Sequence, residues 1–374
     1  MNPPFGSAGV KPQEFRAMLG KPHPFPRKVI NTLPATIPTP TPPPTPPAPR
    51  YLANDMNNSI LSRLEGLTPD DSESSSDNWR LYYPFNTSAQ IYRKNPNCWG
   101  AQAGAYAPLD LTCLPAASIS YAFFGGKGIL ISRRHVLYSS HTNWFDCGGG
   151  SPPTICRLLD NDNVIHDYTI LAHRHSELEE FDIAIAVLNH DVDPSITPAQ
   201  VFPADWTTYF PNGDPSGTLF LREASQQNFR GDLSTHEFQS VSNGLIQYSK
   251  PTAHPAATPW YRRVQGGESG TASAAVVRNT VVAMMCTSWG NWGGAAEWGL
   301  SYDISSTIVQ PGWATSPHAR VLQFIRELNL QIGIDPDDPN HNLSYFDLSP
   351  YSIPPATRDL RLQTPSVSGA IVVT

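Results

Sequence analysis

The sequence predicts an all-β protein, folded as a sandwich or a barrel. From about Trp79 onward, short apolar runs are separated by turns, and only one convincing helix follows them, at 319–330. Charged residues make up 15% of the 374-residue chain, whereas Gly (26) and Pro (38) are frequent. This balance favours many short strands joined by turns over long helices that expose Lys and Glu. Many strands and one late helix together indicate an all-β body.

The strands are predicted in chain order from apolar runs bounded by turn residues. Residues 119–124 alternate as a strand does, a glycine-rich turn follows at 125–128, and 129–131 returns as the partner strand. The further predicted strands are 136–138, 183–188, 219–222, 245–248, 274–277 and 281–285. Within 319–330 the apolar residues lie on one stripe of a helix.

Residues 1–78 predict an arm and linker rather than a domain. Eight of the twelve residues from Pro38 to Pro49 are proline, which indicates an extended polyproline II spacer. Short helices are predicted at 13–20 and 58–67. Two interpretations of these helices stay open: packing on the chain's own domain, or docking on a partner protein. The acidic run 70–77 is typical of a solvated linker.

The C-terminal tail, residues 331–374, is rich in Pro and Asp and contains a last apolar run at 370–373. The tail either wraps the body or adds a strand to a partner, and the sequence does not separate these two interpretations.

Charge and hydropathy exclude some classes of function. The net charge of −7 gives no electrostatic reason to expect nucleic-acid binding, which needs a clustered basic surface. No apolar run approaches the length of a membrane span, and the N-terminus lacks a basic patch followed by an apolar stretch. We therefore expect no membrane span. No secretory signal is visible, so either the protein is not exported by that route or a leader is absent from this sequence, and the compartment stays open.

The chain has five cysteines, so at least one thiol is unpaired if all disulfides are internal. Cys98–Cys113 and Cys147–Cys156 are close enough in sequence to be plausible bridges. No CxxC pair or HExxH run points to zinc, and the pair His173-x-His175 lacks a third ligand at a familiar spacing. We expect no metal and no cofactor.

Three segments carry the chemistry, and they occur in a meaningful order. The run Ser139-Ser140-His141 follows a predicted strand, Asp182 opens the apolar strand 183–188, and Gly267-Glu268-Ser269-Gly270 follows later. His141 and Asp182 are 41 residues apart (182 − 141), and Asp182 and Ser269 are 87 apart (269 − 182). A serine hydroxyl needs a positioned base to become a nucleophile, and a histidine needs an orienting carboxylate. His135, close to the same strand, is interpreted as a structural residue.

These motifs resemble those of the trypsin/chymotrypsin family of serine proteases. Its members carry a small-small-His triplet, then an Asp that opens an apolar strand, then Gly-Asp-Ser-Gly. A fourth match is Ser288-Trp289-Gly290, which resembles the family's substrate-binding edge, and the resemblance covers roughly residues 95–330. It implies two packed Greek-key β-barrels, at 79–195 and 196–330, with a C-terminal helix and extended N- and C-terminal arms.

The resemblance also implies a role for each residue. Ser269 is the expected nucleophile, His141 its general base and Asp182 the group that orients His141. The backbone N–H groups of Gly267 and Ser269 form the expected oxyanion hole. Ser288-Trp289-Gly290 is expected to pair with the backbone of a polypeptide substrate.

Two departures from the family pattern concern activation and specificity. Glu268 stands where zymogen-activated members have an Asp that pairs with a newly cut amine, and no Ile-Val-Gly-Gly-like segment occurs near residue 100. We therefore expect an enzyme that needs no such cut, with Glu268 satisfied internally. Arg263 lies six residues before the nucleophile, where the family has the residue at the base of its specificity pocket. One expectation is therefore that the enzyme prefers substrates with an acidic residue on the acyl side of the scissile bond. The other is that Arg263 points to solvent or pairs with Glu268 or Glu297.

The sequence thus predicts a serine endopeptidase, a hydrolase that its N-terminal arm could tether to a partner or assembly. The alternative is a binding or structural protein that has the protease fold but an occluded or inactive site. A third, weaker hypothesis is an esterase that acts on small acyl substrates through the same triad.

Overall fold

A computed structural model of the chain describes ten stretches, all within one compact unit, Ala48–Thr374. These stretches are residues 48–70, 77–82, 93–116, 128–142, 155–176, 181–224, 231–264, 268–286, 289–290 and 298–355. The predicted helix at 13–20, most of the polyproline spacer, the strand at 119–124 and the apolar run at 370–373 lie outside them.

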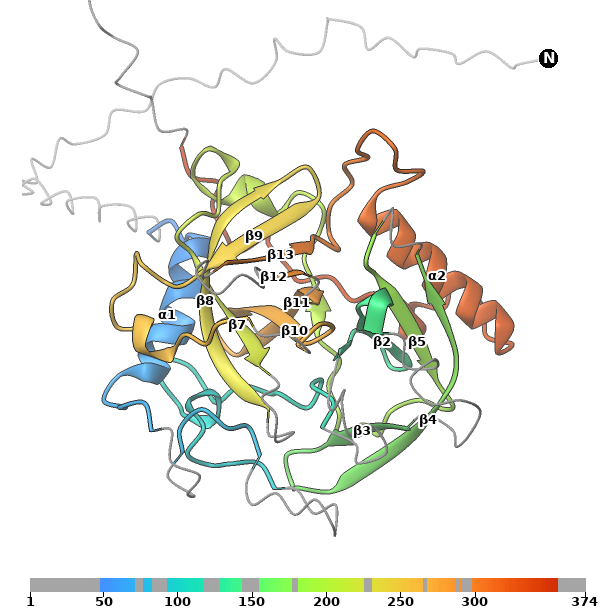
Figure 1. Ribbon diagram of the computed structural model, residues 1–374, viewed down its shortest axis with the longest axis horizontal. Coiled ribbons are helices and arrows are strands. Elements are labelled where there is room, and N and C mark those ends of the chain that lie inside the picture. The colour runs from blue at the N-terminus through green and yellow to red at the C-terminus, as the bar shows by residue number, and fades with distance from the viewer. Residues whose placement is uncertain are drawn as a thin grey trace, which may run out of the picture. The chain divides into compact units, whose positions relative to one another are not determined.

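The fold is β-rich, with two sheets and a C-terminal helix (Figure 1). The first sheet has five antiparallel strands in the order β1-β2-β5-β4-β3. Its strands are β1 (Ile129–Leu130), β2 (His135–Tyr138), β3 (Ile155–Leu159), β4 (Ile165–His175) and β5 (Ala184–Leu188). Every residue of β2 and β5 is buried, which explains why β5 and residues 136–138 of β2 form continuous apolar runs in the sequence.

The second sheet has eight strands in the order β12-β13-β9-β8-β7-β10-β11-β6. They are β6 (Gln200–Val201), β7 (Leu219–Ala224), β8 (Asp232–Ser242), β9 (Leu245–Ser249), β10 (Ala272–Val277), β11 (Thr280–Cys286), β12 (Trp289–Gly290) and β13 (Trp298–Tyr302). Among these described strands, only the pairing of β6 with β11 is parallel. Asn243 and Gly244 have φ of 52° and 74° in the tight turn between β8 and β9, and Asn-Gly is the pair that such a turn favours.

The α-helices α1 and α2 pack on the sheets. Helix α2 (Pro317–Gln331) confirms the predicted late helix; its N-cap Ser316 accepts a hydrogen bond from the Ala319 N–H, and it packs against β4 and β5. Helix α1 (Leu52–Leu64) begins before the predicted 58–67. Its buried residues Leu52, Met56, Ile60 and Leu64 recur every four positions, so they form one stripe that faces β7 and β10.

The C-terminal segment wraps the body as far as the structure describes it. Its backbone pairs with β6, since the Val201 N–H donates to Ser344 O (2.8 Å) and the Phe346 N–H donates to Val201 O (2.9 Å). The Ser352 N–H then donates to Arg50 O (2.7 Å), just before α1. This arrangement agrees with the first of the two interpretations for residues 331–355.

A polar cluster joins this segment to α1. The buried Asp55 carboxylate accepts hydrogen bonds from Arg50 Nε (2.7 Å), Tyr106 Oη (3.1 Å) and Tyr351 Oη (3.0 Å). The Arg50 guanidinium also lies 4.4 Å from the centre of the Tyr351 ring. The first and last described segments of the chain are therefore fastened to each other.

The two candidate disulfides are not formed. Cys98, Cys113 and Cys156 are free thiols, all buried. Burial raises the pKa of the Cys98 and Cys156 thiols to about 12, so both stay protonated and unreactive at neutral pH. Spacing in the sequence left the pairing open, and in the structure these thiols pack as small apolar groups in the core.

None of the helices in the described residues is long and apolar enough to cross a membrane.

Candidate active site

Strand pairing brings His141 and Asp182 together. His141 lies in the short 3-10 turn η2 (Ser140–Thr142) that follows β2, and Asp182 lies just before β5. β2 and β5 are antiparallel neighbours, with Tyr138 opposite Ala184. Because the end of β2 meets the start of β5, residues that are 41 positions apart in the chain (182 − 141) become direct neighbours.

The Asp182 carboxylate accepts three hydrogen bonds from two consecutive residues. Asp182 Oδ2 lies 2.6 Å from His141 Nδ1, and Asp182 Oδ1 accepts from the His141 backbone N–H (3.0 Å) and from Ser140 Oγ (2.8 Å). The Asp182 side chain is fully buried, whereas that of His141 is 32% exposed. The imidazole is thus held through Nδ1 by a buried carboxylate, while part of the ring reaches the surface.

These contacts fix the charge of Asp182. Burial alone would raise its pKa, but the hydrogen bonds from His141 and Ser140 and the nearby His141 charge outweigh burial and lower the pKa. An ionised Asp182 requires a donor at His141 Nδ1, so the proton of the neutral imidazole sits on Nδ1 and the lone pair on Nε2. A histidine in this state is ready to accept a proton at Nε2.

The segment of Ser269 is joined to the first sheet by its backbone. Ser269 and Gly270 form a turn directly before β10, and the φ of Gly270 is +84°, a conformation that favours glycine. The Gly128 N–H donates to Gly270 O (2.8 Å), and Gly128 pairs with Thr271 in a parallel bridge. Gly128 leads directly into β1, the partner of β2, so the turn of Ser269 adjoins the sheet that carries His141.

An aromatic contact links the two sheets beside Asp182. Phe181 is fully buried, and its ring centre lies 4.5 Å from that of Trp313 and 5.8 Å from that of Tyr302 on β13. Since Phe181 precedes Asp182, the backbone at Asp182 is held by the core that both sheets share.

Glu268 is satisfied within the fold by an arginine that sequence reasoning missed. Arg222 on β7 donates to Glu268 Oε2 (2.6 Å), and the side chains are 0% and 2% exposed. Burial alone would lower the pKa of Arg222, but the Glu268 charge outweighs it and raises the pKa. Glu268 O in turn accepts from the Thr271 N–H (3.1 Å) and Thr271 Oγ1 (2.8 Å). The ion pair therefore anchors the residue next to Ser269, as the expectation of internal satisfaction required.

The other predicted site residues are only partly described. Gly267 and Ser288 lie outside the described residues, while Trp289 and Gly290 form β12, an edge strand that pairs with β13. Gly290 lies opposite Gly299 of β13. A Cβ at Gly299 would overlap the Tyr248 ring, so position 299 favours glycine. Arg263 is exposed, in the segment between β9 and β10.

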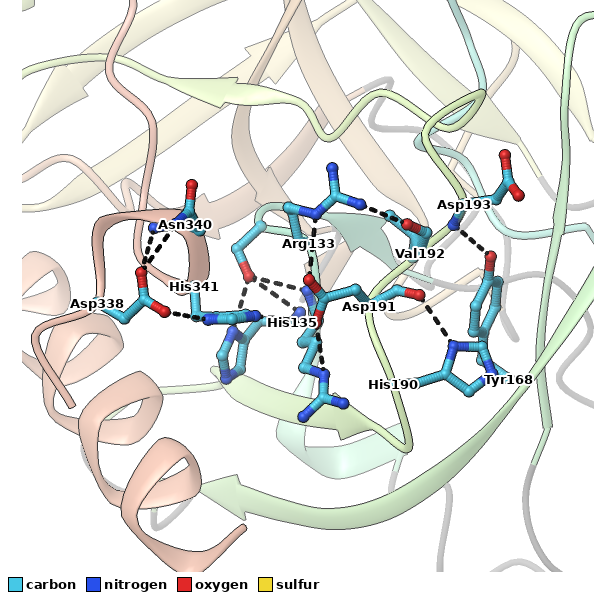
Figure 2. A network of polar contacts seen from close by, with 12 residues as sticks. Arg133, His135, Tyr168, His190, Asp191, Val192, Asp193, Asp338, Asn340 and His341 are labelled. Carbon is cyan, nitrogen blue, oxygen red and sulfur yellow. Dashed lines mark hydrogen bonds and ion pairs between the residues drawn. The ribbon is translucent and has the colours of Figure 1, made fainter. Parts of the chain in front are cut away.

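His135 is confirmed as a structural residue. It is fully buried, and its Nδ1 lies 2.7 Å from Ser132 Oγ. Burial, followed by the neighbouring His341 and Arg134, lowers its pKa to about 3. Figure 2 shows its surroundings, where His341 lies between Asp191 and Asp338, with 2.9 Å between nitrogen and oxygen on each side.

The pair His173 and His175 gives no support to a metal site. His173 Nδ1 is engaged by Tyr138 Oη at 2.8 Å. Across the described part of the chain, no group of three or more His, Cys, Asp or Glu side chains is arranged to hold a metal ion.

No protein-family model matches this chain, and no curated protein matches it either.

Replacement of Arg222 by Leu should strongly destabilise the fold, because it removes the buried guanidinium that pairs with the buried Glu268 carboxylate. We expect the free energy of unfolding in urea to fall by about 3–5 kcal/mol. The control is Arg174→Leu, which breaks the half-exposed pair of Arg174 with Glu327 (3.1 Å) and should cost less than about 1 kcal/mol. Equal losses in the two variants would contradict the anchoring role of Arg222.

Stability should fall as pH drops from about 6.5 toward 3, because His135 stays neutral in the fold while the unfolded chain binds a proton. His236, also buried with a lowered pKa, acts in the same direction. Asp303 acts in the opposite direction, since burial raises its pKa to about 6. We therefore compare variants: His135→Gln should flatten the decline of the melting temperature with falling pH, and the exposed control His175→Gln should not. An unchanged slope in His135→Gln would contradict the assignment.

Proposed function

We propose that this chain is a serine endopeptidase that cleaves peptide bonds through Ser269, His141 and Asp182. The observation that carries the proposal is the buried Asp182 carboxylate 2.6 Å from His141 Nδ1. Such a pair orients the histidine in catalytic triads. The turn Glu268-Ser269-Gly270, whose backbone bonds to Gly128 beside the same sheet, supplies the nucleophile.

In the proposed acylation step, Ser269 Oγ forms a bond with the carbonyl carbon of the substrate while its proton passes to His141 Nε2. Asp182 stabilises the imidazolium that results. The tetrahedral intermediate then breaks its C–N bond, and the proton on Nε2 goes to the leaving amine. The product is an ester between Ser269 and the acyl half of the substrate.

Deacylation repeats these steps with water as the nucleophile. His141 Nε2 takes one proton of the water, its oxygen attacks the ester, and the proton then returns to Ser269 Oγ as the acid leaves. In both steps the N–H groups of Gly267 and Ser269 would stabilise the oxyanion, and loss of one such donor typically costs about 10²–10³ in rate.

The two sheets correspond, in this proposal, to the two β-barrels of the trypsin/chymotrypsin family. Their junction then carries the site, as expected when His141 and Asp182 belong to one barrel and Ser269 to the next. Among the described strands, β12 lies at the edge of its sheet, and this position supports a role in substrate binding, because an extended peptide can add to a sheet edge as one more strand.

Activity in this proposal needs no cut near residue 100. The buried Arg222–Glu268 ion pair already holds the residue before the nucleophile, which is the task that a new N-terminal amine performs in zymogen-activated members of the family. The turn of Ser269 is thus formed as soon as the chain folds.

Labelling by a fluorophosphonate probe tests the proposal. The probe should label the full chain, and labelling should disappear in Ser269→Ala and drop at least about 10³-fold in His141→Ala. A chain that begins at Ala48 is the second form to test, because α1 belongs to the folded body. Labelling only after removal of residues 1–47 indicates an occluded enzyme. No labelling of either form contradicts the proposal and favours the protein with an inactive site.

The expected preference for an acidic residue on the acyl side of the cleaved bond rests on the position of Arg263, six residues before Ser269 in the chain. A peptide library should show cleavage after Glu or Asp, and Arg263→Ala should reduce that selectivity by about tenfold or more. The control is the exposed Arg278 in the turn between β10 and β11, since Arg278→Ala should leave selectivity unchanged. Cleavage after Lys or Arg would contradict the assignment of Arg263.

A further inference from the structure

We infer that Ser140 is a positioning residue whose hydroxyl orients the Asp182 carboxylate that in turn holds His141. The inference rests on the proposed function, and it adds a fourth side chain to the three that the sequence motifs identify. In those motifs Ser140 counts only as a small residue before the histidine, whereas the structure places its hydroxyl 2.8 Å from Asp182 Oδ1.

The geometry assigns each carboxylate oxygen a separate task. Asp182 Oδ2 faces His141 Nδ1, and Oδ1 faces Ser140 Oγ and the His141 backbone N–H. Two donors on Oδ1 resist rotation of the carboxylate about its Cβ–Cγ bond. Oδ2 is therefore kept pointing at the imidazole by bonds that the imidazole itself does not make.

All these donors belong to one rigid unit. Ser140 and His141 are consecutive in the turn η2, directly after the buried strand β2. The carboxylate is thus tied to the same backbone segment that carries the imidazole. A movement of β5 relative to β2 would have to break three hydrogen bonds together.

Burial makes the hydroxyl hard to replace. Ser140 is 7% exposed, and the Asp182 side chain is fully buried. Water would not easily take the place of the lost donor in Ser140→Ala, so Oδ1 would keep one hydrogen bond of two. A buried carboxylate with fewer donors is less stable as an anion.

The loss has a direct consequence for His141. A carboxylate with fewer hydrogen bonds attracts protons more strongly, so it also stabilises the imidazolium of His141 more strongly. His141 then keeps its proton to higher pH and becomes available as a base only there. A purely structural serine would change stability without moving this pH.

The first experiment measures the rate of fluorophosphonate labelling between about pH 5 and 8, where histidine titrates. Ser140→Ala should label about tenfold more slowly on the plateau, since a hydrogen bond to a charged group is lost. The acid limb of its rate profile should shift to higher pH. Ser140→Thr retains the hydroxyl and should restore both the rate and the limb.

The matched control is Ser216→Ala, which removes another hydroxyl that donates to a carboxylate, that of Asp214, in the segment before β7. Its labelling should equal that of the wild type. If the wild type is labelled at Ser269 and Ser140→Ala matches it in rate and limb, the inference on Ser140 fails while the proposed function stands.

A second measurement does not depend on activity. In the Ser269→Ala background, NMR titration of the His141 ring should give a higher midpoint when Ser140 is also Ala. Equal midpoints overturn the inference even if labelling slows, because slower labelling alone would then reflect a structural defect. A wild type that is never labelled overturns the proposed function, and with it the catalytic meaning of Ser140.

Discussion

The pairing of β2 with β5 is the constraint on which the site depends. Its antiparallel register places the turn after β2 beside Asp182, two residues before β5, and so sets the distance between His141 and Asp182. Both strands are buried along their whole length, and α2 packs against β5. A slip by one residue would turn every side chain of a strand to the opposite face. The apolar core therefore fixes the geometry of this pair more firmly than the polar contacts could alone.

Buried charged groups also fix how elements are placed relative to each other where those elements meet. The chain has few charged residues, yet Asp182, Asp55 and the pair Arg222–Glu268 are all buried. A buried charge without its partners is strongly unfavourable, so each of these groups tolerates only the arrangement in which its donors are present. Each lies where two segments distant in sequence must meet: β2 with β5, α1 with the C-terminal segment, and β7 with the turn of Ser269.

The sequence predicted several strands from their apolar runs and missed others, among them β4 and β8. β5, β7, β9, β10, β11 and α2 all fall on predicted segments. β8 was missed because five of its first six residues, 232 and 234–237, are polar yet buried, and β4 because much of it is half-buried without strict alternation. Spacing was also insufficient for the cysteines, since Cys98, Cys113 and Cys156 are free although two pairs are near in sequence.

The order of the motifs was enough to predict that His141 and Asp182 lie close together, because each is next to one of two strands, β2 and β5, that pair with each other. The order of the motifs did not predict the contacts of Ser140 or Arg222. Ser140 differs from other small residues only by a hydroxyl whose acceptor is 42 residues away in the chain (182 − 140). Arg222 follows the apolar residues 219–221 of β7, and such a position indicates a buried charge but does not identify its partner, Glu268. Long-range pairing of this kind is decided by the fold.

The core contains a second cluster of buried apolar residues, and the segments outside the family resemblance contribute side chains to it. Leu52 and Met56 of α1, and Leu348 and Tyr351 of the C-terminal segment, belong to the same apolar cluster as Trp206. These four side chains are buried, and without them the cluster would expose apolar surface at a cost of about 25 cal/mol per Å². Residues 95–330, the region of the sequence resemblance, therefore do not contain the whole of this cluster. The additions on both sides, fastened to each other through Asp55, are part of what keeps the turn of Ser269 in place, since α1 packs on β7 and β10.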